Sequence, residues 1–123
     1  MDTRSLVSVV DDDESVRESL PDLLRVFGFA VQPFKSGEEF LASDYMEHTK
    51  CLILDIAMPG MSGFDVQREL QYRKQQIPIV FITAYKDETT RPSVRGEGPV
   101  ACLLKPFSDT ALLEAVRTAL GVN

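Results

Sequence analysis

The sequence predicts an α/β fold in which five short strands alternate with helices around a parallel sheet. Short apolar, β-branched runs recur along the chain, and between them apolar residues follow helical spacing. A length of 123 residues, with 44% hydrophobic and 26% charged residues, is ordinary for one globular domain. Alternation of strands and helices implies right-handed crossovers and helices on both faces of the sheet. We therefore expect a doubly wound (βα)₅ domain that spans residues 1–123.

The first strand and helix are expected within residues 6–27. Residues 6–10 form a short β-branched run that ends abruptly at an acid, as a buried strand would. Residues 14–27 place apolar side chains at helical spacing, and Gly28 is a plausible stop signal. Residues 29–34 read as a second strand, and Pro33 favours an edge position, because proline cannot donate to a neighbouring strand.

The middle of the chain predicts two more helices around a central strand. Residues 36–39 open a helix that should carry Phe40, Leu41 and Tyr45 on its apolar side. The third strand, residues 51–55, is apolar on both faces and ends in an acid, which is typical of the centre of a parallel sheet. A loop over residues 58–63 then leads into another helix.

The last part of the chain contains the least regular segment. The fourth strand, residues 79–83, ends in a hydroxyl residue. Two prolines and two glycines interrupt the segment that follows, so we expect a fourth helix that is short or irregular, with residues 86–99 the least ordered part of the domain. The fifth strand covers residues 100–105, and Ser108 should cap the last helix.

Composition and charge exclude several classes of function. The chain has 13 Lys and Arg against 19 Asp and Glu, a net charge of −6, without a basic cluster, so direct nucleic-acid binding is not expected. No apolar run approaches the ~20 residues of a membrane span, and no signal peptide is recognisable. Cys51 and Cys102 lie in apolar runs, which suggests reduced thiols and a cytoplasmic setting.

The carboxyl ends of the predicted strands carry a set of reactive side chains. Parallel strands bring these ends to one edge of the sheet, where ligands bind in this class of fold. The residues there are Asp11, Asp12, Asp55, Thr83 and Lys105. Carboxylates held so close together repel one another, and hard oxygen ligands suit Mg²⁺. The sequence therefore predicts a magnesium site.

These residue types suit phosphoryl transfer. With a metal ion nearby, the Asp55 carboxylate can act as a nucleophile toward a phosphoryl group. Lys105 and Thr83 would then hold the phosphoryl oxygens, since such chemistry needs mainly positioning and charge neutralisation.

Four motifs, in order and at suitable spacing, resemble the receiver domain of bacterial two-component response regulators. They are V-V-D-D-D at 9–13, D-I-A-M-P-G-M-S-G at 55–63, T-A at 83–84 and K-P-F at 105–107. The resemblance covers essentially the whole chain and implies a flavodoxin-like sheet of order 2-1-3-4-5.

The resemblance also implies roles for individual residues. Asp55 would be the phosphoacceptor, Asp11 and Asp12 the acidic pair, and the backbone carbonyl of Ala57 a further metal ligand. Thr83 would be the switch hydroxyl and Lys105 the phosphate-binding lysine.

The resemblance to this family also implies protein partners. A sensor histidine kinase would supply the phosphoryl group, and His48, in a polar stretch, reads as a surface residue and not as a donor. The chain would be no enzyme beyond its own phosphorylation and dephosphorylation. It would control transcription through an output domain, with a homodimer through the fourth helix, fifth strand and fifth helix as a possible arrangement.

Two departures from the family pattern leave alternatives open. Cys102 stands where the family usually has an aromatic switch residue, and the fourth helix is interrupted. A receiver-like interaction module that works without phosphorylation is therefore one alternative. A hydrolase of the haloacid dehalogenase type is the other, although Ala57 stands where such enzymes carry a general acid. Asp13 and Glu14 read as an ordinary solvated helix start.

Overall fold

The computed structural model describes residues 4–84 and 101–121 of the chain. The predicted short or irregular fourth helix, over residues 86–99, lies outside these described residues. The elements in order are β1 (Leu6–Val10), α1 (Glu14–Val26), β2 (Ala30–Phe34), α2 (Gly37–Leu41), the 3₁₀ turn η1 (Met46–His48), β3 (Cys51–Asp55), α3 (Gly63–Tyr72), β4 (Ile79–Thr83), β5 (Ala101–Leu104) and α4 (Asp109–Leu120). The helix α4 is the last of the fold and corresponds to the fifth helix of the sequence-based expectation.

The five strands form one parallel sheet in the order β2-β1-β3-β4-β5, which confirms the predicted topology. As expected from Pro33, β2 is an edge strand, and β3 lies at the centre with every residue buried. In the register of the sheet, Val10 is opposite Leu54 and Thr83 is opposite Leu104. The strands therefore end close to the same edge.

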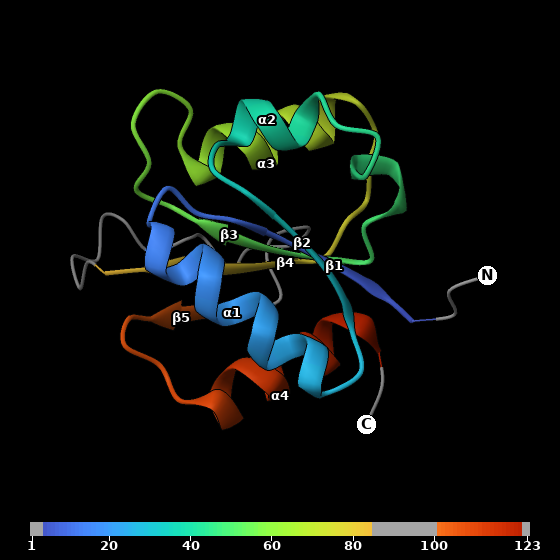
Figure 1. Cartoon of the computed structure of the whole chain (residues 1–123). Coiled ribbons are helices and arrows are strands. Elements are labelled where there is room, and N and C mark those ends of the chain that lie inside the picture. Colours follow the sequence, from blue (N-terminus) through green and yellow to red (C-terminus); the bar gives the residue numbers. More distant parts are fainter. Residues whose placement is uncertain (1–3, 85–100, 122–123) are drawn as a thin grey trace.

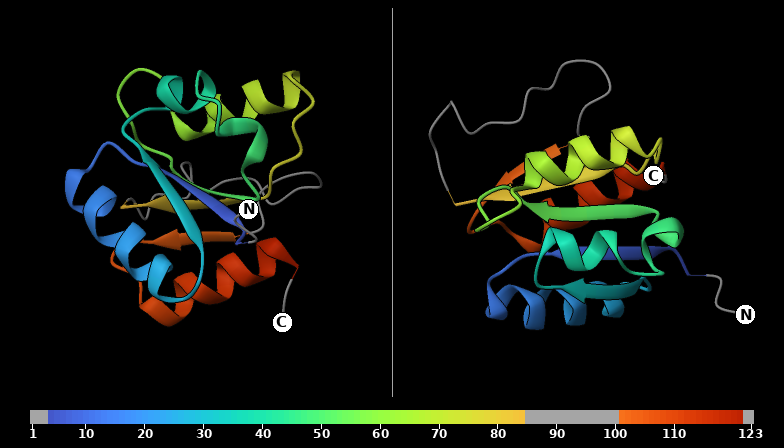
Figure 2. Two further views of the ribbon diagram at one scale, coloured as in Figure 1. Left: turned by 45° about the vertical axis from the view of Figure 1, so that its right-hand side comes forward. Right: turned by 90° about the horizontal axis from the view of Figure 1, so that it is seen from above.

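Helices cover both faces of the sheet. Figure 1 shows α2 and α3 above the strands and α1 and α4 below them, and Figure 2 shows the same layers from two other sides. Each face has its own apolar cluster, because successive residues of a strand point to opposite faces. Val9, Ile53 and Ile82 pack toward α1 and α4, whereas Leu54 and Phe81 pack toward α2 and α3.

Short polar side chains begin the helices. Asp13 caps α1 by accepting a hydrogen bond from the backbone N–H of Ser15 (2.9 Å), and the hydrogen bond from the Ser15 hydroxyl (2.8 Å), followed by this backbone bond, lowers the pKa of the Asp13 carboxyl. Ser108 caps α4 as predicted, by accepting from the N–H of Ala111 (3.0 Å). Such caps satisfy backbone donors that have no partner within the helix. Gly28 follows α1 with a φ of +95°, a backbone conformation that glycine adopts without strain.

The helix α2 is shorter than the sequence predicts. It ends at Leu41, and Tyr45 lies beyond it with 45% of its surface exposed, although its ring still touches Phe34 edge-on. The Ser43 hydroxyl donates to the carbonyl of Phe40 (2.7 Å), a local bond that competes with continued helix. None of the helices among the described residues has the length and apolar character needed to cross a bilayer.

Candidate functional site

The carboxyl edge of the sheet brings together the side chains that the sequence placed there. Asp11 and Asp12 follow β1, Asp55 ends β3, Thr83 ends β4 and Lys105 follows β5. Four of the five strands thus supply a functional side chain at or just after their carboxyl ends, and β2 supplies none. Because the strands are parallel and in register, residues far apart in the sequence meet at one place.

Three carboxylates form the centre of the site. Asp11, Asp12 and Asp55 each offer one oxygen atom, and these atoms all lie within 4.8 Å of one another. Asp11 is fully buried, Asp55 is only 4% exposed, and Asp12 faces solvent. Asp11 and Asp55 are thus buried within the protein, whereas Asp12 is accessible to a ligand from solvent.

Lys105 is the cation that faces these acids. Its Nζ lies 3.0 Å from Oδ2 of Asp11 and 3.9 Å from Oδ2 of Asp55. The backbone N–H of Lys105 donates to the carbonyl of Thr83 (2.8 Å), which fixes the lysine where β5 ends. Thr83 itself is buried at this edge. The ammonium group therefore lies next to the predicted phosphoacceptor.

The ionisation of the site reflects its crowding. Burial, followed by the negative charge of Asp11, raises the pKa of Asp55 to about 7, although Lys105 opposes the shift. Burial alone would lower the pKa of Lys105, but its close contact and charge interaction with Asp11, then the charge of Asp55, raise the pKa above its ordinary value. Burial and a neighbouring negative charge both disfavour the ionised form of a carboxyl group. Because the pKa of Asp55 is raised even beside Lys105, the charge of one ammonium does not offset these two effects.

Two groups on α1 and its cap hold Asp11 in place. The backbone N–H of Asp13 donates to Oδ1 of Asp11 (2.8 Å), and Nη1 of Arg17 donates to the backbone carbonyl of Asp11 (2.9 Å). Arg17 is not among the site residues that the sequence predicts. Its only signal was the position of a cation on the first turns of the helix that follows the acidic run.

The loop between β3 and α3 is packed directly against Asp55. The N–H of Ala57 donates to Oδ1 of Asp55 (3.3 Å), so Ala57 lies beside the carboxylate. The N–H of Gly63 donates to the carbonyl of Ile56 (3.0 Å), and a Cβ at Gly63 would lie 2.6 Å from the backbone oxygen of Asp55. Only glycine therefore allows α3 to begin this close to the site.

The donor set fits a hard divalent cation. Oδ2 of Asp11 is buried and has no hydrogen-bond partner among the described residues, even though the Lys105 ammonium lies 3.0 Å away. Three carboxylates with one ammonium leave negative charge to neutralise, and Mg²⁺ prefers such oxygen ligands together with water. The acidic cluster is thus a candidate metal centre.

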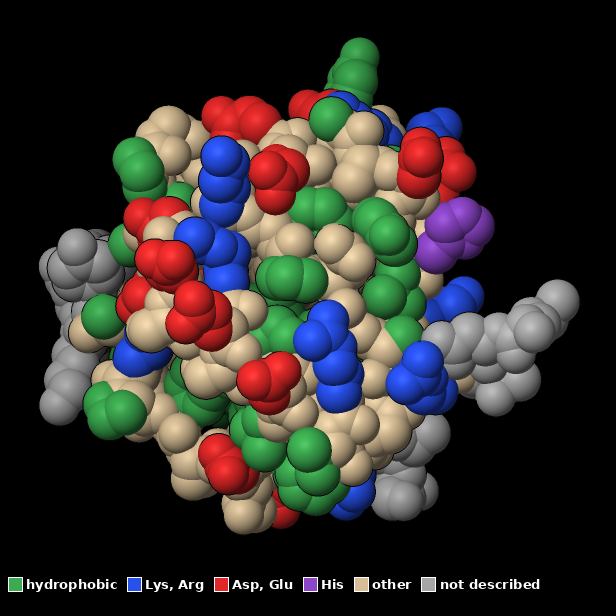
Figure 3. All heavy atoms as spheres, in the orientation of Figure 1, with side chains coloured by type: hydrophobic (Ala, Val, Ile, Leu, Met, Phe, Trp, Pro, Cys, Tyr) green, Lys and Arg blue, Asp and Glu red, His purple; other side chains and the backbone are tan. Residues whose placement is uncertain are grey.

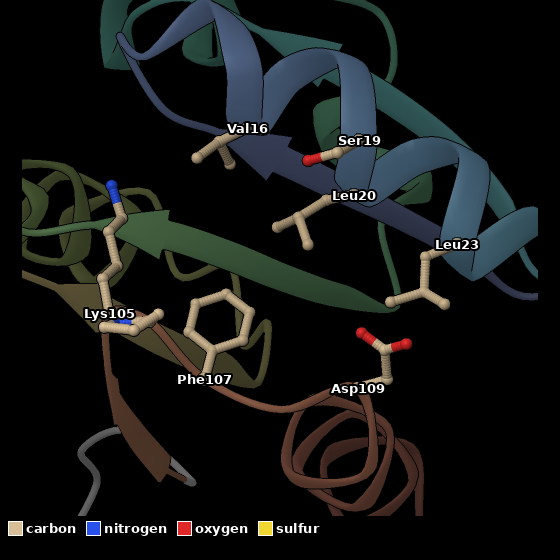
Figure 4. Close-up of a pocket in the computed structure, with 8 residues that line it drawn as sticks. Val16, Ser19, Leu20, Leu23, Lys105, Phe107 and Asp109 are labelled. Carbon is tan, nitrogen blue, oxygen red and sulfur yellow. The ribbon is translucent and has the colours of Figure 1, made fainter.

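An apolar hollow begins beside this site. It has a volume of about 430 Å³ and lies between α1 and the segment that joins β5 to α4. Figure 4 shows Val16, Leu20 and Leu23 of α1 on one side and Phe107 on the other, with the Lys105 side chain at one end. A partner seated here would lie next to Lys105.

Other residues named from the sequence are not part of the carboxylate cluster. His48 is exposed in η1, and Asp13 and Glu14 are exposed at the start of α1, as expected. Cys102 is opposite Phe81 in the sheet and packs against the cluster under α2 and α3. Burial raises the pKa of Cys51 to about 12, so this thiol is structural.

Comparison with known proteins identifies a single family over most of the chain. The model of the response regulator receiver domain matches residues 7–117. Nodulation protein W of Bradyrhizobium diazoefficiens is 44% identical over 117 residues, which are 95% of this chain and 52% of that protein. Response regulator protein TodT of Pseudomonas putida is 41% identical over 119 residues, 97% of this chain and 52% of that protein. The chain spans about half the length of these curated relatives.

Solved structures agree with the sequence matches. The response regulator StyR superposes with a TM-score of 0.88 at 45% identity, over 96% of this chain and 60% of that chain. The structure of FixJ-N gives a TM-score of 0.82 at 37% identity, over 95% of this chain and 94% of that chain.

Proposed function

Because the chain belongs to the response regulator receiver domain family, we propose that Asp55 accepts a phosphoryl group from a sensor histidine kinase. The two-component receiver function follows from the family and from relatives such as TodT and StyR. The choice of Asp55, and the roles of the residues around it, are our proposals. We propose further that residues 1–123 form one receiver domain of a cytoplasmic protein.

One observation carries the proposal. Asp55 is buried at the centre of the sheet edge, with two further carboxylates and the Lys105 ammonium around it. A cluster of buried like charges costs stability, so its presence in an otherwise well-satisfied fold points to a functional demand. Among the three acids, Asp55 ends the central strand and is the one whose carboxylate also contacts the β3–α3 loop.

Mg²⁺ is the ion that we propose for the site. Asp12 and Asp55 would hold it together with the backbone carbonyl of Ala57, with Asp11 as the buried acid behind them. When bound, the ion would neutralise charge on the carboxylates and on the incoming phosphoryl group. The exposed position of Asp12 suits a ligand that exchanges with solvent.

Side chains of the protein would carry out the phosphoryl transfer itself. A carboxylate oxygen of Asp55 forms the new bond to phosphorus, and the bond from phosphorus to the donor's imidazole nitrogen breaks, so that the imidazole leaves with the electron pair. Lys105 would bind a phosphoryl oxygen in place of one carboxylate contact, and the Thr83 hydroxyl would bind another.

The apolar hollow beside Lys105 supports a docking place for the kinase. A phosphohistidine must approach Asp55 at the open edge, and the hollow lined by Leu20, Leu23 and Phe107 starts there. Apolar side chains from a donor helix would gain burial in it, while the acids remain accessible.

Control of transcription is the signal output that we propose. Relatives of about twice this length are named as transcriptional regulators, among them FixJ of Rhizobium meliloti. We propose that this receiver controls transcription through such an output domain and does not itself bind nucleic acid. A homodimer through the fourth-helix region, β5 and α4 is consistent with Leu104, an exposed large hydrophobic residue of β5.

Incubation with acetyl phosphate and Mg²⁺ tests the phosphoacceptor. Intact-mass measurement should show one added phosphoryl group on the wild type and none on Asp55→Asn, because an amide is not a nucleophile. Asp44→Asn, a change at an exposed acid away from the site, should behave as the wild type. Wild-type protein that gains no mass would favour the phosphorylation-independent module.

The same samples address the hydrolase alternative. Steady turnover of small phosphate esters, beyond one equivalent per chain, would indicate a phosphatase. We expect none, because Ala57 offers no acid to protonate a leaving group.

A further inference from the structure

The opposite edge of the sheet carries a second hollow, which the phosphoacceptor function does not use. It has a volume of about 550 Å³, within the range of small-molecule sites, and lies where β1 and β2 begin and where the chain enters β3. Its lining combines the side chains of Arg4, His48 and Lys50 with the apolar surface of Leu6, Ala30 and Tyr45.

The charge of this hollow is unusual for the chain. The protein has a net charge of −6, but the lining contains two cations and an imidazole and no acid among the described residues. The neighbouring acids Asp44 and Glu47 are exposed on the same loop and are not part of the lining. Figure 3 shows the purple imidazole at the right of that face, with green and blue side chains below and beside it and a red side chain directly above it.

The walls of the hollow are fixed by hydrogen bonds. The N–H of Lys50 donates to the carbonyl of Leu6 (2.8 Å), and the N–H of Ala30 donates to the carbonyl of Ser5 (3.0 Å). These bonds tie the three chain segments of the hollow to one another. The site is therefore preorganised, which reduces the ordering cost of binding.

The aromatic wall is held from behind. The Thr49 hydroxyl donates to the backbone carbonyl of Tyr45 (2.8 Å), and the Tyr45 ring meets Phe34 edge-on at a centroid distance of 6.1 Å. The ring is thus packed on one side, and 45% of the residue remains exposed for contact with a ligand.

We propose that this hollow is a binding site for a small amphipathic anion. Lys50 and His48 would hold its carboxylate or phosphate group, and its apolar body would lie on Leu6, Ala30 and the Tyr45 ring. A lysine ammonium pairs well with such oxyanions, and an aromatic face suits a flat apolar group. The site is separate from Asp55 and does not depend on phosphorylation.

NMR titration of the isotope-labelled full chain tests this site with four probes. Benzoate and phenyl phosphate should shift the amide resonances of His48 and Lys50, whereas benzyl alcohol and inorganic phosphate, each lacking one half of the proposed chemistry, should bind at least about tenfold more weakly. Equal affinity for benzyl alcohol would overturn the anionic part of the proposal, and equal affinity for inorganic phosphate would overturn the apolar part.

A pair of charge reversals separates this site from general electrostatics. Lys50→Glu should weaken phenyl phosphate binding by about tenfold or more, whereas Arg68→Glu, an equal change of charge on exposed α3, should change it less than about twofold. Equal losses in both variants would show general charge attraction and overturn the site. A short acidic peptide that binds more tightly than phenyl phosphate would also overturn it, in favour of a protein partner.

Discussion

The described structure buries polar side chains in two regions of the sheet and balances them in opposite ways. Beside β1, the hydroxyls of Ser8 and Thr49 lie 2.7 Å apart, and Thr49 also donates to the carbonyl of Tyr45. At the carboxyl edge, Asp11 and Asp55 are also buried but bear ionisable carboxyl groups, and Oδ2 of Asp11 has no hydrogen-bond partner among the described residues.

The difference separates polar groups that stabilise the fold from those that we propose for phosphoryl transfer. A neutral hydroxyl pair whose donors are used costs little to bury, and it ties the loop before β3 to the first strand. Buried carboxylates with one ammonium cost stability until a cation or a phosphoryl group changes their balance. Substitutions in the two regions should therefore have opposite consequences for stability and for phosphorylation.

Apart from changes at Asp55 itself, the largest effect on function is expected for Asp12→Ala. Loss of this exposed carboxylate should reduce Mg²⁺-dependent phosphorylation by about 100-fold or more, while the unfolding free energy changes by less than ~0.5 kcal/mol. Mass spectrometry over time measures the rate. Mg²⁺ should raise the melting temperature of the wild type and not of the variant.

Glu14→Ala is the matched control for that prediction. Glu14 is an exposed acid in the same run, but it lies in the first turn of α1 and is not part of the carboxylate cluster. It should phosphorylate like the wild type. Phosphorylation of Asp12→Ala at the wild-type rate would show that the metal assignment is wrong.

Gly63→Ala should lower both the stability of the fold and the rate of phosphorylation. The added methyl group would lie 2.6 Å from the backbone oxygen of Asp55 and 2.9 Å from Cα of Ile56, neither of which can move alone. We expect a loss of about 2–3 kcal/mol, together with slower phosphorylation, because the loop beside Asp55 must shift. Urea unfolding and the acetyl phosphate assay measure the two effects.

Val66→Ala provides the comparison for Gly63→Ala. This core residue of α3 is fully buried in the cluster under α2 and α3, so its truncation should destabilise the fold and leave the rate of phosphorylation of the folded protein near that of the wild type. Equal loss of rate in both variants would mean that stability alone explains the effect of Gly63→Ala.

In the neutral region, Thr49→Val should cost about 1–3 kcal/mol, because it leaves the buried Ser8 hydroxyl without its partner. Adding Ser8→Ala should recover part of that loss, since removing both polar groups is less costly than removing one. Denaturant unfolding at neutral pH measures all three proteins. A double variant that loses as much as the sum of the single variants would show that the two hydroxyls are not coupled.

Sequence patterns were sufficient for the fold because its strands are short apolar runs with sharp ends. β3 has the bounds that its apolar run and terminal acid predict. The end of α2 could not be foreseen, because it depends on a single side-chain bond from Ser43. Apolar spacing placed Tyr45 on a helix, whereas the chain turns before reaching it.

The membership of the site was predictable, but its internal arrangement was not. The acids, Thr83 and Lys105 could be predicted as one site because they stand at the ends of predicted strands. A parallel sheet must bring these strand ends together at one edge. Which acid is buried depends on tertiary packing, so Asp11 and Asp12, although adjacent in sequence, differ completely in exposure. The bond from Arg17 to the Asp11 carbonyl also depends on the exact position of α1.

The smallest effect is expected for Arg17→Gln, which tests how tightly the charged region must be held. Arg17 contacts the backbone of Asp11 and touches no carboxylate of the cluster in any described contact, so its loss should loosen the acids without removing a ligand. We expect Mg²⁺ affinity to fall by roughly threefold to tenfold, with Arg17→Lys less affected. The unfolding free energy should change by less than ~1 kcal/mol.

Arg25→Gln is the matched control, because Arg25 lies on the same helix and its Nη2 also donates to a backbone carbonyl, that of Val31 (3.1 Å), but far along α1 from the acids. Isothermal titration with Mg²⁺ measures both variants. If the two arginines stabilise the helix alike but only Arg17 positions Asp11, their stability losses should match, whereas only Arg17→Gln should weaken the metal. Equal Mg²⁺ affinities in the two variants would mean that the cap at Asp13, whose N–H holds Oδ1 of Asp11 at 2.8 Å, is sufficient to position the acid.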